Sequence, residues 1–168
     1  GKANTVFYGV NDAAISGTGG TLDFNTITLN KGAVTANASV TPPVLDIQRA
    51  FTSAGSATTA ILSSFTAGVL KISGTFTQTN PIFTSSSYTI PSTGGLWLTN
   101  PNFTISGVSG SPTLSGLLKI QDGTYNIGTA SGNSMGFSSN SIIRIDGGTI
   151  NAAGRFGVGS AANTINYA

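Results

Sequence analysis

The sequence predicts an all-β protein, a parallel β-helix (solenoid) of about seven coils with a period of about 24 residues. Two observations carry this prediction. Good helix formers are scarce, since the 168 residues include no Glu, one Met, four Lys and three Gln, whereas Thr, Val, Ile, Phe and Tyr are plentiful. In addition, a short apolar-x-apolar triplet recurs along almost the whole chain, and turn-forming residues follow most of its copies.

The triplet occurs seven times at nearly even spacing. Its copies are Leu22-Asp23-Phe24, Leu45-Asp46-Ile47, Leu70-Lys71-Ile72, Leu96-Trp97-Leu98, Leu118-Lys119-Ile120, Ile143-Arg144-Ile145 and Ile165-Asn166-Tyr167. Their first residues lie 22 to 26 residues apart. A period of this length, with two or three short strands per repeat, is typical of one coil of a parallel β-helix. Each strand then pairs with its equivalent one coil later, about 4.8 Å away.

A second apolar element follows most triplets after a turn. Its members are Ile27 and Leu29, Phe51, Phe76, Phe103 and Ile105, Tyr125 and Ile127, and Ile150. The turns are rich in Gly and Asn, which accept the positive φ angles that a sharp corner between strands requires. We therefore expect the outer two residues of each triplet to point inward and the middle one outward. A β-sandwich is the competing fold, but it has no reason to repeat one unit so regularly.

Residues 48–65 fit the repeat poorly. They are rich in Ala, Ser and Thr, and Ile61, Leu62 and Phe65 lie at a spacing that a helix allows. A short helix and a wide loop on an ordinary coil are both open here. Gly55 and the many Thr residues favour the loop.

The chain is expected to be a single β-helix segment over residues 1–168. Residues 1–20 form a cap or a partial first coil around Val6-Phe7-Tyr8, and residues 21–168 form the repeated coils. Residues 81–92 are expected to leave the ladder, because Pro cannot donate a ladder hydrogen bond. The last residues read as the middle of a strand, so we expect the segment to be part of a longer chain.

Composition excludes several classes of function. The absence of His and Cys excludes metal sites built on those residues, His-based catalytic triads and disulfides. A net charge of +2 from seven Lys and Arg and five Asp cannot supply the dense basic face of a nucleic-acid binder. The sequence also contains no apolar run long enough to cross a membrane. Partners that are nucleic acids or membranes are therefore not expected.

Two stretches carry a family resemblance. Residues 117–127 (LLKIQDGTYNI) and residues 143–151 (IRIDGGTIN) resemble coils of right-handed parallel β-helix proteins, the pectin-lyase-like solenoids. They are most similar to the secreted surface adhesins and cargo proteins that Bacteroidota export by type IX secretion. The resemblance implies a secreted, extracellular or cell-surface protein. It also implies further domains of the same parent chain as partners, together with surface glycans or the secretion machinery.

A pair of carboxylates is the candidate metal or catalytic site. The triplet alignment puts Asp23 and Asp46 at the same outward position of adjacent coils, about 5 Å apart. Such a pair could hold Ca²⁺ or act as a carboxylate dyad, or it could be two solvated side chains, with Asp46 relieved by Lys71 on the next coil. No other cofactor is expected. Asp122 and Asp146 precede Gly in turns, where Asp binds its own backbone.

The candidate ligand-binding residues are Trp97, Lys71 and Lys119. They lie in the outward column of the triplets, with Trp97 in the middle. In a sugar-binding site, Trp97 would stack on the sugar ring, and the two lysines would donate hydrogen bonds. The alternative is that Trp97 is covered, either by residues 81–92 or by a neighbouring domain.

Threonine-rich stretches suggest a minor alternative, an ice-binding solenoid. Thr26-Ile27-Thr28 and residues 75–79 resemble the threonine arrays of such proteins, which carry Thr-x-Thr on successive coils. In the sequence alignment the matching positions hold Asn102 and Thr104, then Thr124 and Asn126, then Thr149 and Asn151. The array is therefore impure.

The sequence favours a non-catalytic structural or adhesive segment that presents or spaces a binding surface. The alternative is a carbohydrate-active β-helix, either a polysaccharide lyase or hydrolase or a tail-spike-like glycan binder. An enzyme of this kind requires at least two carboxylates that converge in an exposed groove, whereas a stalk leaves them scattered.

Overall fold

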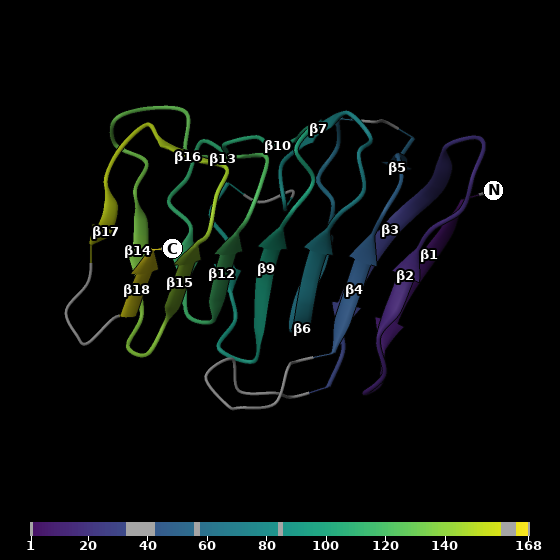
Figure 1. Cartoon of the computed structure of the whole chain (residues 1–168), viewed down its shortest axis with the longest axis horizontal. Helices are drawn as coiled ribbons and strands as arrows, with labels where there is room; N and C mark the ends of the chain where they lie inside the picture. The colour runs from purple at the N-terminus through teal and green to yellow at the C-terminus, as the bar shows by residue number, and fades with distance from the viewer. Residues whose placement is uncertain (1, 33–42, 56–57, 84–85, 159–163, 168) are drawn as a thin grey trace.

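The computed structural model describes residues 2–32, 43–55, 58–83, 86–158 and 164–167. Within these ranges the fold is all-β, without a helix, and its parallel strands stack as a β-solenoid of about six turns with a period of about 25 residues. Figure 1 shows the strands of successive coils side by side, from the N-terminal to the C-terminal end of the molecule. The predicted fold class is confirmed.

The main sheet holds the triplet strands. It runs through β2 (Ala13–Ile15), β4 (Val44–Ile47), β6 (Ser64–Ile72), β9 (Gly94–Leu98), β12 (Leu117–Ile120), β15 (Ile142–Ile145) and β18 (Thr164–Tyr167). Every neighbouring pair in this row is parallel. Such a row arises when each coil returns its strand to the same side, so the backbone hydrogen bonds of one coil are completed by the next.

Two smaller sheets form the other sides of the later coils. The second sheet contains β7 (Gln78–Asn80), β10 (Phe103–Ile105), β13 (Thr124–Ile127) and β16 (Thr149–Ala152). The third sheet contains β8 (Thr89–Ile90), β11 (Thr113–Leu114), β14 (Met135–Phe137) and β17 (Phe156–Val158). A coil therefore passes through three strands with a corner after each.

The N-terminal end has a different arrangement. The strands here are β1 (Ala3–Tyr8), β3 (Leu22–Asn30) and β5 (Phe51–Ser53). β3 pairs in parallel with β1 and β5, and its last residues pair with the start of β6. Because β1 and β2 both pair with later strands, the described part of residues 1–20 contributes ladder strands, as a partial first coil does.

The first triplet of the sequence alignment is wrong. Leu22-Asp23-Phe24 is not the ladder neighbour of Leu45-Asp46-Ile47, because it pairs with Phe51-Thr52-Ser53. The strand that precedes Leu45-Asp46-Ile47 in the ladder is Ala13-Ala14-Ile15. The two alanines give little hydrophobic signal. The interval from Ala13 to Leu45 is also longer than the interval between any two later triplets. The even spacing of the later coils therefore favoured the wrong partner.

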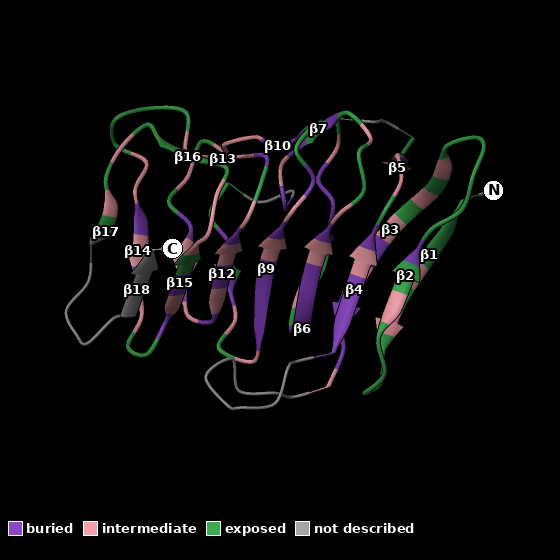
Figure 2. Cartoon of the chain, viewed as in Figure 1, coloured by how far each residue is buried: buried purple, intermediate pink, exposed green. Residues whose placement is uncertain are grey.

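The core consists of the inward residues of all three sheets, and Figure 2 shows the buried strands of the central coils in purple. In β12, for instance, Leu118 and Ile120 have no exposed surface, whereas Lys119 between them is partly exposed. This is the predicted alternation, with the outer triplet residues inside. Full burial of each Leu or Ile contributes about 1.5–3 kcal/mol to stability.

One predicted core strand is shifted. Phe76 precedes β7, and the inward positions opposite Phe103 and Ile105 are taken by Gln78 and Asn80. The Gln78 side chain donates to the Phe51 carbonyl (2.9 Å) and accepts from the Phe51 amide (3.2 Å). An amide side chain can thus replace a strand neighbour, which a search for apolar residues does not detect.

The described part of residues 81–92 belongs to the coil, contrary to the predicted excursion. Phe83 forms a parallel bridge with Leu62, and Thr89–Ile90 is β8 of the third sheet. Tyr88 also lies in the core. The prolines are tolerated because Pro81 lies before β8 and Pro91 follows it, so neither stands within the strand. In residues 48–65, the described part holds β5 and no helix, in agreement with the preferred loop.

Candidate functional site

The candidate site is the outward face of the main sheet. Its central column contains Ala14, Asp46, Lys71, Trp97, Lys119 and Arg144. Asn166 pairs with Arg144 in the register of the next strand. From Asp46 onward this is the predicted column, so the structure does bring Lys71, Trp97 and Lys119 together on three neighbouring strands. Because the strands are parallel and in register, equivalent residues of successive coils lie side by side in a continuous row.

The structure does not place the predicted carboxylate pair on neighbouring strands. Asp23 lies on the part of β3 that pairs with β5, where its carboxylate accepts a hydrogen bond from the Thr52 hydroxyl. The neighbours of Asp46 in the ladder are Ala14 and Lys71. The stacking of Asp23 on Asp46 in adjacent coils, from which the Ca²⁺ site and the dyad were predicted, is therefore not found in the ladder. In the parts of the chain that the structure describes, no group of three or more acidic residues could hold a metal ion.

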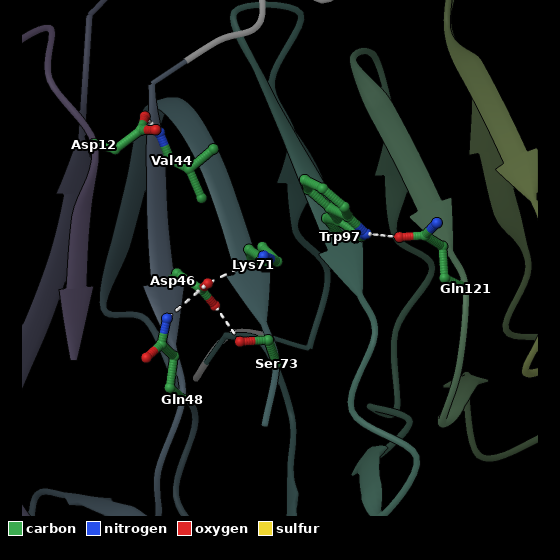
Figure 3. Close-up of polar contacts among 8 residues, drawn as sticks. All are labelled: Asp12, Val44, Asp46, Gln48, Lys71, Ser73, Trp97 and Gln121. Atoms are coloured by element: carbon green, nitrogen blue, oxygen red, sulfur yellow. Dashed lines mark hydrogen bonds and ion pairs between the residues drawn. The ribbon is translucent and has the colours of Figure 1, made fainter. Parts of the chain in front are cut away.

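Asp46 is instead the centre of a small polar network, drawn in Figure 3. One oxygen of its carboxylate lies 3.1 Å from the Lys71 ammonium and accepts from the Gln48 amide at 3.1 Å. The other accepts from the Ser73 hydroxyl at 2.6 Å. Because most of its hydrogen-bonding sites are occupied, Asp46 is held in one position at the surface.

Trp97 stands between two cations. The Lys71 ammonium lies 4.6 Å from the centroid of the indole ring, and the Lys119 ammonium lies 4.1 Å from it. The two lysines come from the strands on either side, and the indole N–H donates to Gln121 at 2.5 Å (Figure 3). The half-buried ring is thus engaged in cation–π contacts, each worth about 0.5–1 kcal/mol at an exposed site.

Lys119 has an altered acidity. Its pKa is lowered below the ordinary value of 10.5, chiefly because of burial against its neighbours and further because of the positive charges of Arg144 and Lys71. The negative charge of Asp146 opposes this effect. The face therefore carries two positive charges that repel the Lys119 ammonium.

This acidity predicts a change in fluorescence. Trp97 is the single tryptophan, so its emission reports on this site alone. When the pH rises toward 10.5, we expect the emission of Trp97 to change as Lys119 loses the charge that contacts the ring. Lys119→Met keeps the aliphatic chain and removes the charge, so it should reduce this transition, while Lys71 still contacts the ring. Lys2→Met, far along the chain, is the control, and an unchanged transition in Lys119→Met would contradict the assignment.

A surface hollow of about 380 Å³ lies beside this column. It is lined by Asp12, Ala13, Ala14, Val44, Asp46, Gln48, Lys71 and Trp97. The hollow exists because β2 carries alanines where later coils carry large outward residues. The sequence analysis did not identify Asp12, Gln48 or the alanines as members of a site. Ala13-Ala14-Ile15 had not been recognised as the strand beside Leu45-Asp46-Ile47.

The remaining carboxylates have local partners. Asp12, at the end of the hollow, accepts from the Val44 amide at 2.8 Å (Figure 3). Asp122 accepts from the amide of Gly123 at 2.9 Å, as its turn position predicted. Asp146, directly after β15, lies 3.8 Å from Arg144 on that strand. Each of these contacts holds a strand or a corner in place.

In the described residues no helix is long and apolar enough to cross a membrane. No protein-family model matches the chain, and neither a curated protein nor a solved structure is significantly similar to it. The fold is therefore established as a parallel β-solenoid, and the narrower likeness to pectin-lyase-like and type IX secreted proteins stays a prediction from the repeat pattern.

Proposed function

We propose that this chain is a non-catalytic structural or adhesive segment of a secreted or cell-surface protein. In this role its coils form a rigid shaft, and the charged column with Trp97 is the surface that the shaft presents. Partners would be further domains of the parent chain, surface glycans or the type IX secretion machinery. No cofactor is required for such a role.

The observation that carries this proposal is that the Asp carboxylates are bound to other groups of the protein. The chain has five acidic residues, all Asp. Their partners are a backbone amide, a hydroxyl or a cation, and each contact fastens a strand end, a corner or two neighbouring coils. General acid–base hydrolysis requires two carboxyl groups free to exchange protons with a substrate. These five carboxyl groups have structural duties instead.

Surface chemistry supports the same role. Gly, Thr, Ser and Asn make up about half of the sequence, and only 7% of the residues are charged. Contacts of uncharged side chains are insensitive to the salt concentration of the surroundings, unlike ion pairs. The core is continuous from coil to coil, so the shaft is stabilised by the sum of neighbouring coil interfaces.

A second candidate, glycan binding with or without carbohydrate-active chemistry, is favoured by the hollow. Its volume of about 380 Å³ lies in the range of small-ligand sites, and it combines an aromatic wall at Trp97 with the polar groups of Asp46, Gln48 and Lys71. Two carboxylates, Asp12 and Asp46, line it. Both carboxylates accept hydrogen bonds from the protein. Glycan binding in this hollow is therefore favoured over hydrolysis.

Turnover of polysaccharides separates the two candidates. The chain would be incubated with polygalacturonate, alginate and a neutral glucan, and both reducing ends and unsaturated uronates would be measured. We expect no products from the chain or from Asp46→Asn. Products that appear with the chain and disappear with Asp46→Asn would contradict the structural proposal.

Retention on a surface tests adhesion. With the chain immobilised, we expect it to retain at least one of these polysaccharides or intact bacterial cells. Lys71→Ala removes the ion pair with Asp46 and one contact of Trp97, so it should reduce retention, whereas Lys2→Ala should not. Equal retention by both variants would exclude this face as the adhesive surface.

A further inference from the structure

The second sheet presents a continuous column of threonines. Thr79, Thr104, Thr124 and Thr149 face one another on β7, β10, β13 and β16 in strict parallel register. Figure 1 shows these strands following one another along the solenoid. The residues on both sides of Thr104, and those on both sides of Thr124, are buried, so these hydroxyls lie on the outer surface.

This register differs from the sequence alignment. The alignment matched Asn102 and Thr104 with Thr124 and Asn126, which made the array impure. In the structure Thr104 pairs with Thr124, and Asn102 lies in the turn before β10, where its amide donates to the carbonyl of Thr75 at 2.8 Å. A shift of two residues therefore converts a mixed pattern into a column made only of threonine.

A second column runs beside the first on the last two coils. Asn126 pairs with Asn151, and the Asn151 amide donates to the Asn126 side-chain oxygen at 3.0 Å. The two columns form a grid of about 4.8 Å between coils and about 6.6 Å along the strand. Threonine is stiff at χ1, so its methyl and hydroxyl groups keep this order without a bound partner.

The grid carries no charge. The outward side chains of the four second-sheet strands are the four threonines, Asn126 and Asn151, which we call the threonine face. The outward column of the main sheet contrasts with it, because that column carries Lys71, Lys119 and Arg144. Beyond Asn126 and Asn151 the surface falls into an open hollow of about 460 Å³, which bounds the flat part of the face.

We infer that the threonine face binds ice. Crystalline water repeats its oxygen atoms at spacings close to those of this grid, and a preordered array can hold a layer of water in that pattern. The methyl groups leave the neighbouring water to bond to itself, while the hydroxyl and amide groups anchor it. Charged groups would orient water around themselves instead, and the threonine face has none.

Inhibition of ice recrystallisation tests this inference on the chain. Thr124→Tyr places a bulky ring in the centre of the face and should raise the concentration needed for inhibition about tenfold, the loss typical of one central contact. Thr113→Tyr is the matched control, because Thr113 is a half-buried outward threonine on the third sheet. It should leave the activity unchanged.

Two results would overturn the inference: no inhibition by the unaltered chain beyond that of albumin at equal concentration, or equal losses in the two tyrosine variants. Thr104→Val provides a second, isosteric variant in case Thr124→Tyr fails to fold. It keeps the methyl group, so it should lose less activity than Thr124→Tyr. The circular dichroism spectrum and melting temperature of each variant show whether the solenoid is intact.

Discussion

Replacing Gly123 by alanine is expected to lower the free energy of unfolding by about 2–5 kcal/mol. Gly123 forms the corner between the main and second sheets with φ of +75°, a conformation that residues with a Cβ rarely adopt. An added Cβ would also collide with the Asn100 carbonyl oxygen and lie 2.8 Å from that of Phe103. These are backbone atoms of the preceding coil, so neither can move without disturbing the ladder.

The measurement is urea unfolding followed by circular dichroism. Gly132→Ala is the matched control, because Gly132 is exposed, has no atom within 4 Å of its added Cβ and has no positive φ. Its effect should stay within about 0.5 kcal/mol. Equal stability of the two variants would show that the corner adapts and that coil stacking is looser than the contacts indicate.

The second large effect concerns a buried pair of phenols. The hydroxyls of Tyr88 and Tyr125 lie 2.6 Å apart in the core, and Tyr125 has no exposed surface. Tyr88→Phe and Tyr125→Phe each leave one buried hydroxyl without this partner, so each should cost about 1–3 kcal/mol. The double variant removes both hydroxyls and should cost less than the sum of the two single variants.

The same pair predicts a loss of stability at high pH. Burial raises the pKa of Tyr88 from 10.0 to about 12, and burial together with the neighbouring Tyr88 raises the pKa of Tyr125 well above 10.0. Above pH 10 the unfolded chain releases these protons while the folded chain keeps them. Stability is therefore fully present below pH 10 and is lost as the pH rises toward 12, by about 2–3 kcal/mol for Tyr88 alone.

Unfolding in urea between about pH 8 and about pH 11.5 checks both parts of this prediction. The stability of the unaltered chain should fall steeply over the upper part of the range. The Tyr88→Phe Tyr125→Phe variant should show a shallower fall, because its core holds no phenol at this position. Parallel curves for the two proteins would exclude the tyrosine pair as the source of the pH dependence.

Much of the fold could be predicted from the sequence because its signal is local and repeated. From Leu45 onward, each triplet places two apolar residues on one side of a strand, and the structure buries both in the four coils from Leu45 to Ile120. In the next coil Ile143 is buried and Ile145 is partly buried. The outward neighbours Lys71, Trp97 and Lys119 follow from the same alternation. A regular period needs no long-range information, because each coil repeats the contacts of the previous one.

The errors occurred where a ladder position lacks an apolar residue. Ala14 fills the first coil without bulk, and Gln78 fills an inward position with an amide. An alignment of apolar residues therefore chose Leu22 and Phe76 as replacements. The choice of Leu22 moved Asp23 beside Asp46. The match of Phe103 with Tyr125, in place of Ile105 with Tyr125, shifted the threonine column by two residues.

By itself, the sequence determined the fold class, the direction of the outward residues in the regular coils and the absence of His and Cys chemistry. The three-dimensional fold was needed to show which strands are neighbours at the N-terminal end. It also showed that Lys71 and Lys119 lie over the ring of Trp97 and that four threonines share one column. The physical reason is register. Alternation specifies which way a side chain points, but which residue it meets depends on the number of residues in every corner and loop between the strands.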